Sequence, residues 1–256
     1  MMDSMNYIFK IFRTLIFFVC LSCQIMPEEP LRIGVTKDYP PMAFTNKQGN
    51  LAGLEIDFAR LISSHLDREI IFVPLPFSEL LPNIQRKEID LAMAGISNTL
   101  DRSFNVNFLP AYAEVSTMLL IRREQANEFQ KFTQQFKSRL IAGYKKNSTG
   151  GLIINHEFNK NKQMAYDDTD QAVTALLNKE IDFLLQEEPV VSQYLQTHDN
   201  LVAIPWGSNK EALAWAVNHE NHALYSSLNN IYLKMKVNGS LNKTIHKWMP
   251  SYNQGK

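Results

Sequence analysis

The alternation of strand and helix patterns along residues 31–94 is the feature that most constrains this fold. Three short apolar runs have the length of strands: Leu31 to Val35, Ile70 to Val73 and Leu91 to Ala94. Between them, residues 55–66 carry apolar side chains at helical spacing. A second helix is predicted from Phe77 to near Lys87, with Ser78 as its N-cap. Strands that alternate with helices over short connections predict an α/β fold with a parallel sheet.

Such sheets bind ligands beyond the carboxyl ends of their strands. Tyr39, Phe77 and the stretch from Gly95 to Arg102 all fall at or near those ends. Gly95 allows a ligand to approach the backbone, and Ser97 offers a hydroxyl group. We therefore expect a binding site at this edge of the sheet.

Arg102 is the charged residue of this stretch. Thr99 is predicted to cap a short helix whose first turn holds Asp101 and Arg102. A guanidinium group offers planar paired donors that suit a carboxylate. The alternative is a surface ion pair between Arg102 and Asp101 or Asp90, of the kind that contributes little.

A second unit repeats the pattern. Strands are predicted at 118–121, 140–143 and 183–185, and a helix at 170–177. The turn Asn147 to Gly151 leads from strand to helix, so Ser148, Thr149 and free backbone donors are expected to hold an anion there, or merely to cap the helix. Gln186 and Glu187 follow the last of these strands.

An identical tetrapeptide ties the two units together. Lys87-Glu-Ile-Asp90 and Lys179-Glu-Ile-Asp182 each end a helix and lead into a strand, and Gly95 and Glu187 follow five residues later. A strand at 212–217 and helices at 221–236 and 239–248 need a sheet to cover, which suggests that the chain returns to the first unit. We predict two lobes with two crossovers: residues 31–121 with 212–256, and residues 122–211.

The amino terminus has the features of a secretory signal peptide over residues 1–23. Lys10 and Arg13 precede an apolar run too short for a lasting membrane anchor. Cys20 and Ser22 fit a cleavage site, and Cys23 would suit lipidation, so a lipoprotein and a freely soluble protein are both open. Both cysteines lie in this leader, so no disulfide is expected in the mature chain.

Charge and composition exclude several classes of partner. The formal net charge is zero and the basic residues are scattered, which argues against nucleic acid. No cofactor is expected, because the chain has no phosphate-binding glycine motif and its six histidines are spread out, with His219 and His222 the one close pair.

Five segments resemble the extracellular solute-binding proteins of bacterial amino-acid importers, family 3. They begin at Gly34, Gly49, Phe77, Lys87 and Gly239. The resemblance implies a two-lobed periplasmic-binding-protein-like fold (type II), hinged at two crossover strands. It also implies a monomer that closes on a free polar amino acid and delivers it to a membrane permease of an ABC transporter, in the periplasm or on the outer face of the membrane.

The resemblance also implies roles for particular residues. Arg102 would clamp the α-carboxylate, helped by Ser97, by the backbone at Ala94 and Gly95, and by Thr149 of the second lobe. Tyr39 and Phe77 would cover the ligand, and Glu187 would receive the α-ammonium. Lys145 and Gln186 would line the side-chain pocket, where Lys145 would suit an acidic or amide ligand, although Lys145 equally fits a solvated surface position.

Two departures from the family bear on function. Aspartate is usual in the family where Glu187 stands. An acidic residue is common where Thr36 stands, and the lack of one here weighs against a lysine or arginine ligand. The first departure motivates an alternative, an exported cyclohexadienyl or arogenate dehydratase, because a desolvated carboxyl group can act as a general acid. A third possibility is an amino-acid sensor with a different membrane partner.

Overall fold

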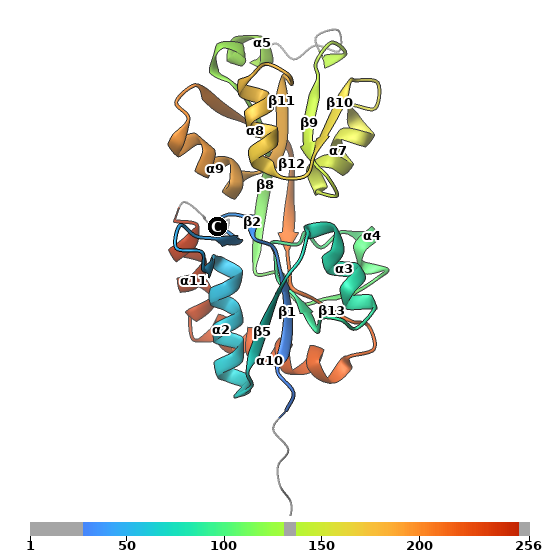
Figure 1. The fold of residues 1–256 in the computed structure, drawn as a ribbon, viewed down its shortest axis with the longest axis vertical. Helices are drawn as coiled ribbons and strands as arrows, with labels where there is room; N and C mark the ends of the chain where they lie inside the picture. The colour runs from blue at the N-terminus through green and yellow to red at the C-terminus, as the bar shows by residue number, and fades with distance from the viewer. Residues whose placement is uncertain (1–27, 131–136, 251–256) are drawn as a thin grey trace, which may run out of the picture.

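The computed structural model describes residues 28–130 and 137–250, which form two α/β lobes connected by two long strands (Figure 1). The predicted signal peptide lies outside the described residues. The two-lobed α/β architecture expected from the sequence is confirmed.

The first lobe is built on a mixed sheet. Its strands lie in the order β5 (Ile70–Pro74), β1 (Leu31–Val35), β6 (Leu91–Ala92), β13 (Ala216–Val217) and β7 (Asn107–Phe108). β1 runs parallel to β5 and β6, whereas β13 runs antiparallel to both of its neighbours. The parallel sheet predicted for residues 31–94 is therefore present, and the chain adds antiparallel strands where it returns.

Helices cover both faces of this sheet. α2 (Leu54–Leu66), α10 (His222–Val237) and α11 (Ser240–Trp248) share one apolar cluster with alternate residues of β1. α3 (Phe77–Gln85) packs in a separate cluster with β6 and β13. A small sheet of β2 (Asp38–Tyr39), β3 (Ala43–Thr45) and β4 (Leu51–Ala52) and the short helix α4 (Leu100–Ser103) lie toward the second lobe (Figure 1).

The second lobe repeats this plan. Its strand order is β10 (Gln163–Tyr166), β9 (Ala142–Lys145), β11 (Phe183–Glu187), β8 (Ala113–Arg122) and β12 (Leu201–Leu213). After the short helix η1 (Arg123–Gln125), α5 (Ala126–Gln130) packs with α7 (Thr149–Glu157) in one apolar cluster. α8 (Thr169–Leu177) and α9 (Glu188–Thr197) contribute to another. Each lobe thus has its own core.

β8 and β12 are the two crossover strands, and both are longer than predicted. They pair antiparallel from Ala113 to Arg122, with a register shift between Pro205 and Lys210. The strand predicted over 212–217 is divided, because the buried pair Ala214-Trp215 separates the end of β12 from β13. Thr117 to Ile121 also pair with β11. We therefore propose that the first lobe boundary lies before Thr117, inside β8, rather than after Ile121.

The repeated Lys-Glu-Ile-Asp tetrapeptide adopts the same structure in both lobes. Lys87 and Lys179 both have positive φ angles, 60° and 66°, at the point where the chain leaves a helix. Asp90 accepts a hydrogen bond from the backbone N–H of Arg32, and Asp182 accepts one from that of Ile141, at 2.8 and 2.7 Å. The match in sequence therefore reflects a real structural repeat.

Two local predictions were wrong. Ser78 is not the N-cap of α3, because Pro76 occupies that position without a side-chain cap. The strand predicted over Leu91 to Ala94 ends at Ala92, although Met93 and Ala94 remain fully buried. The apolar run therefore predicted which residues are buried, but not where the strand ends.

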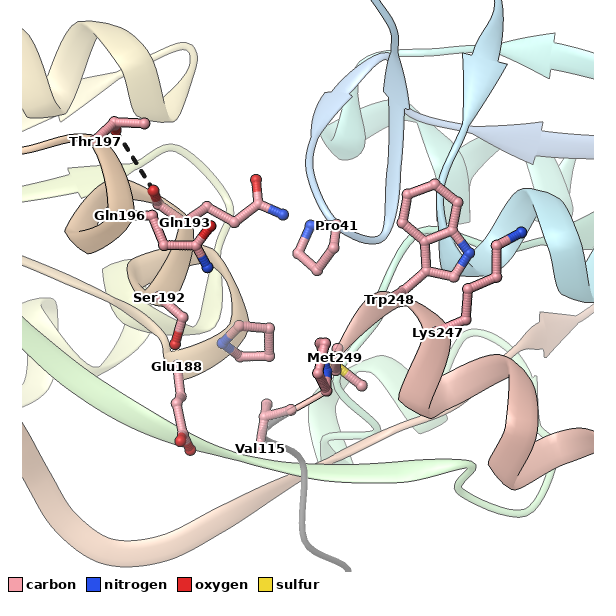
Figure 2. Close-up of a pocket in the computed structure, with 12 residues that line it drawn as sticks. Pro41, Val115, Glu188, Ser192, Gln193, Gln196, Thr197, Lys247, Trp248 and Met249 are labelled. Atoms are coloured by element: carbon pink, nitrogen blue, oxygen red, sulfur yellow. Dashed lines mark hydrogen bonds between the residues drawn. The ribbon is translucent and has the colours of Figure 1, made fainter.

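A groove of about 430 Å³ lies between the lobes beside the crossover strands (Figure 2). Pro41, Trp248 and Met249 lie on one side of it, and Gln193 and Gln196 of α9 on the other. Lys247, on its rim, is held by an ion pair with Asp57 at 2.5 Å. None of the eleven predicted site residues lines this groove, so the candidate site lies elsewhere.

Candidate functional site

The predicted site residues converge on a second, smaller cavity between the lobes. Its volume is about 10 Å³, roughly the room that one water molecule needs. Nine predicted residues line it: Tyr39, Phe77, Gly95, Ser97, Lys145, Ser148, Thr149, Gln186 and Glu187. Arg102 lines an adjoining cavity of about 210 Å³ that shares Phe77. Residues from both lobes therefore meet where the sequence predicted a site.

The side chain of Ala94 lies outside the cavity, whereas the prediction for Ala94 concerned its backbone. It is fully buried in the apolar cluster under α3, together with Leu80 and Ile84, and its side chain does not line the cavity. The run of apolar residues that precedes Gly95 continues the core up to the edge of the site.

Four contacts join the lobes across this cavity. The Tyr39 hydroxyl donates a hydrogen bond to Glu187, and Lys145 forms an ion pair with Asp38 at 3.1 Å. The Thr149 hydroxyl donates to Ser97 Oγ at 3.1 Å. The fourth contact is from an Arg102 nitrogen to the carbonyl oxygen of Asn147, 3.2 Å away. Six of these eight residues are ones that the sequence assigned to ligand binding, and Asp38 and Asn147 are the other two.

Arg102 is a cation without a carboxylate partner among the described residues. Thr99 caps α4 as predicted, and its hydroxyl accepts from the Arg102 backbone N–H. The guanidinium group donates to the Ser97 carbonyl oxygen at 3.0 Å and stacks over Phe77, with 5.4 Å to the ring centroid. Burial lowers the pKa of Arg102, because the charged form loses solvation.

The alternative considered for Arg102, a surface ion pair with Asp101 or Asp90, is not found in the structure. Asp90 forms its ion pair with Arg32, at 2.7 Å. Arg102 is involved in none of the ion pairs of residues 28–130 and 137–250. Two of its five N–H donors bond the carbonyl oxygens of Ser97 and Asn147, and the others can serve a carboxylate.

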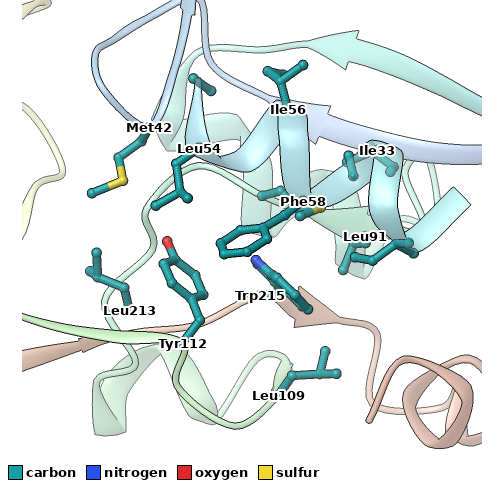
Figure 3. Packing of buried hydrophobic residues seen from close by; sticks show 14 of the residues in the cluster. Ile33, Met42, Leu54, Ile56, Phe58, Leu91, Leu109, Tyr112, Leu213 and Trp215 are labelled. Atoms are coloured by element: carbon teal, nitrogen blue, oxygen red, sulfur yellow. The ribbon is translucent and has the colours of Figure 1, made fainter. Parts of the chain in front are cut away.

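The backbone at Gly95 is held by a buried carboxylate that sequence reasoning missed. Glu55 of α2 accepts from the Gly95 N–H at 2.7 Å, from the Tyr112 hydroxyl at 2.6 Å and from Trp215 Nε1 at 2.9 Å. These rings and Phe58 pack together in the core of the first lobe (Figure 3). The Gly95 N–H is therefore already used, so it is not free for a ligand.

Gly95 itself has a conformation that favours glycine. Its φ is +63°, and a Cβ atom there would lie 2.9 Å from Met42 Cγ and 3.2 Å from a ring carbon of Tyr39. Burial raises the pKa of Glu55 to about 7, although its three donors favour the ionised form. Glu55 thus positions Gly95 from inside the core.

Two carboxylates lie close to the cavity, and the sequence predicted one of them. Glu187 ends β11 and is 5% exposed, and Glu211 comes from the crossover strand β12. Glu211 accepts from Ser97 Oγ at 2.5 Å and from Thr117 Oγ1 at 2.6 Å. Burial, and secondarily the charge of Glu211, raise the pKa of Glu187 to about 7, while the hydrogen bond from Tyr39 opposes the shift.

The remaining second-lobe residues have different roles. Ser148 is the N-cap of α7: its hydroxyl accepts from the Gly151 N–H at 3.1 Å and donates to the Lys145 carbonyl at 2.7 Å. Gln186 donates to Thr169 at 3.1 Å, and its Oε1 atom is buried without a hydrogen-bond partner among the described residues. Ser148 therefore caps the helix, which is the alternative role considered for it. Gln186 leaves a buried acceptor without a partner among the described residues.

The described part of the chain lacks two further features, a metal-binding cluster and a membrane-spanning helix. Over these residues, no group of three or more histidine, cysteine, aspartate or glutamate side chains has the arrangement of a metal site. The same part of the chain has no helix long and apolar enough to cross a membrane.

Comparison with known proteins identifies the family. Residues 31–251 match the family described as bacterial extracellular solute-binding proteins, family 3. The chain belongs to this family. It is similar to ABC transporter arginine-binding protein 1 of Escherichia coli (strain K12), with 26% identity over 227 residues that cover 87% of this chain and 91% of that protein.

Two further relatives extend the comparison. The arginine-binding periplasmic protein of Mannheimia haemolytica is 23% identical over 232 residues, covering 89% of this solute-binding protein and 94% of that one. The fold also resembles the crystal structure of an ancestral amino-acid-binding protein described as a precursor of cyclohexadienyl dehydratase. That structure has a TM-score of 0.78 and 23% identity, with coverage of 86% of this chain and 94% of that chain.

Proposed function

We propose that this protein is a receptor that binds a free amino acid between its lobes and delivers it to an ABC importer. The observation that supports this most strongly is the unpaired guanidinium of Arg102 on one lobe, opposed by the buried carboxylate of Glu187 on the other. An amino acid carries a carboxylate and an ammonium group, so each end has a partner of opposite charge. A cleft poor in water strengthens both contacts.

Binding of this kind favours closure. Arg102 belongs to the first lobe and Glu187 to the second, so a ligand that contacts both interacts best with the closed arrangement. Ser97 and Thr149 lie beside each other from opposite lobes and offer further hydrogen bonds to the ligand. In this proposal, ligand contacts replace or join the direct contacts between the lobes.

The names of the relatives support the wider context. They include an ABC transporter arginine-binding protein and an arginine-binding periplasmic protein, which is consistent with an extracytoplasmic receptor and a permease as partner. We propose that the protein acts as a monomer, either freely soluble or anchored at Cys23. Mass spectrometry of the mature protein distinguishes these two forms, because a lipidated Cys23 carries the mass of its acyl chains.

The test is a binding screen with the mature protein, first unfolded and refolded to remove any ligand carried through purification. Thermal shift against the common amino acids identifies candidates, and calorimetry measures their affinity. Truncating Arg102 to alanine is expected to weaken binding by about 100-fold, because it removes a charged partner from a buried site. Arg60→Ala is the matched control, since Arg60 is an exposed residue that pairs with Asp57. Failure of every amino acid to bind the wild-type protein would refute the proposal.

A second candidate is a dehydratase, favoured by one observation. Glu187 is a buried carboxyl group with a pKa raised to about 7, so it can hold a proton at neutral pH and donate it to a departing hydroxyl group. Incubation with prephenate or arogenate, followed by detection of an aromatic product, tests this. The absence of product at high enzyme concentration, with Glu187→Gln as the background control, would exclude it.

A further inference from the structure

The candidate site holds more unpaired negative charge than positive charge. Among the described residues, the side chains that donate hydrogen bonds to Glu187 and Glu211 are neutral hydroxyl groups, those of Tyr39, Ser97 and Thr117. Neither carboxylate is involved in any ion pair of residues 28–130 and 137–250. The buried Glu187 and the half-buried Glu211 therefore both lack a cationic partner among the described residues.

The positive side of the balance is smaller. Lys145 is 6% exposed at its side chain and already pairs with Asp38, which cancels its charge locally. Arg102 is then the one unpaired cation near the cavity within the described residues. One guanidinium thus stands against two carboxylates.

We propose that the ligand is an amino acid with a cationic side chain, and that Glu211 supplies the second negative charge that selects it. This deepens the proposed function and rests on it. In this arrangement the ligand carboxylate forms an ion pair with Arg102, and the α-ammonium of the ligand forms one with Glu187. The charge of Glu211 then remains, and a second ammonium or a guanidinium group on the ligand balances it.

The atoms that face the cavity fit a donor-rich ligand. Ser97 donates its hydroxyl hydrogen to Glu211, so its oxygen presents lone pairs to Thr149 and to the cavity. Gln186 lines the same cavity, and its side-chain carbonyl oxygen has no hydrogen-bond partner among the described residues. Ammonium and guanidinium groups donate hydrogen bonds and accept none, so they match these acceptors.

Glu211 supplies a negative charge near the site that is missing at the position of Thr36. Thr36, where the family resemblance implied an acidic residue, is fully buried, and its hydroxyl donates to the Ala43 carbonyl oxygen at 3.3 Å. Glu211 enters from a different strand, one hydrogen bond behind Ser97, and acts on the ligand through its charge. Its charge already acts on Glu187 at the end of β11, where it contributes to the raised pKa of that carboxyl group.

The experiment compares cationic amino acids with neutral ligands of nearly the same shape. Calorimetry at pH 8 on the refolded protein measures arginine against citrulline and lysine against norleucine. The wild-type protein is expected to prefer each cationic member by about tenfold or more. Glu211→Gln should lower arginine affinity by about tenfold, while citrulline affinity changes by less than about threefold.

Matched variants separate charge from structure. Glu188→Gln removes the same charge from an exposed residue next to Glu187 in sequence, on the rim of the neighbouring groove, and should leave the preference unchanged. Glu211→Asp retains the charge and should retain most of the preference. Glu211→Gln should also lower the pKa of Glu187 and move the pH dependence of binding downward, which a purely structural role would not do.

The outcomes distinguish this inference from the proposed function. Binding of citrulline as tightly as arginine to the wild-type protein would overturn the inference and leave the amino-acid receptor intact. Equal losses for both ligands in Glu211→Gln would do the same. The wild-type comparison decides the point even where a Glu211 variant fails to fold, and the absence of any amino-acid binding would refute the proposed function itself.

Discussion

Lowering the pH from 7 to 5 is expected to weaken amino-acid binding through Glu187, because its carboxyl group must be ionised to receive an ammonium group. Burial and Glu211 raise its pKa to about 7. The group is then about half ionised at pH 7 and about one-hundredth ionised at pH 5. Since apparent affinity scales with the ionised fraction, the dissociation constant should rise about 50-fold, or about 2.3 kcal/mol.

Calorimetry at several pH values, in buffers of different ionisation enthalpy, measures this effect. Binding at pH 7 should release about half a proton, as the ammonium group displaces the proton from Glu187. Tyr39, Glu211 and Arg102 are the other titratable groups that act on this carboxyl group. Glu187→Gln assigns the effect: it should bind more weakly at pH 8 and lose most of the pH dependence. A change below about threefold in the wild-type protein between pH 7 and pH 5 would refute the reasoning.

The same group predicts the opposite trend for the ligand-free protein. A carboxyl pKa raised by folding stabilises the folded state fully below the unfolded pKa, and this contribution is lost as the pH rises through 7. Between pH 5 and pH 8 the free energy of unfolding should fall by roughly 2 to 3 kcal/mol from Glu187 alone. The difference between wild type and Glu187→Gln in urea titrations isolates it from the similar contribution of Glu55.

Three further changes test separate parts of the structure. Gly95→Ala should lower the free energy of unfolding by about 1–3 kcal/mol, because φ is +63° and the new Cβ atom would lie against Met42. Urea titration measures this loss of stability, and an unchanged midpoint would show that alanine is not strained at this position. Lys145→Ala removes the ion pair with Asp38 and should favour separated lobes by about 1 kcal/mol or less, seen as a larger radius of gyration in solution scattering. Arg122→Ala should cost about 2–4 kcal/mol of stability, since its buried guanidinium bonds two carbonyl oxygens, yet leave ligand affinity unchanged.

Local patterns in the sequence were sufficient for the elements and their order. The strand at Leu31 to Val35, the helix cap at Thr99 and the cap at Ser148 depend on residues within a few positions of one another, so they could be predicted. The repeated Lys-Glu-Ile-Asp segment was also visible in the sequence, because both copies lead a helix into a strand and adopt the same local conformation.

Tertiary structure decided which residues contact one another at the site. Glu211 is 114 residues from Ser97, and Glu55 is 40 residues from Gly95, so neither contact leaves a short-range signal in the sequence. The pairing of Tyr39 with Glu187 spans 148 residues and exists because the two lobes meet. The sequence alone determined which residues stand at the ends of the strands. Only the packing of one lobe against the other decided which charges remain unpaired, because that depends on distances between segments that the chain order does not specify.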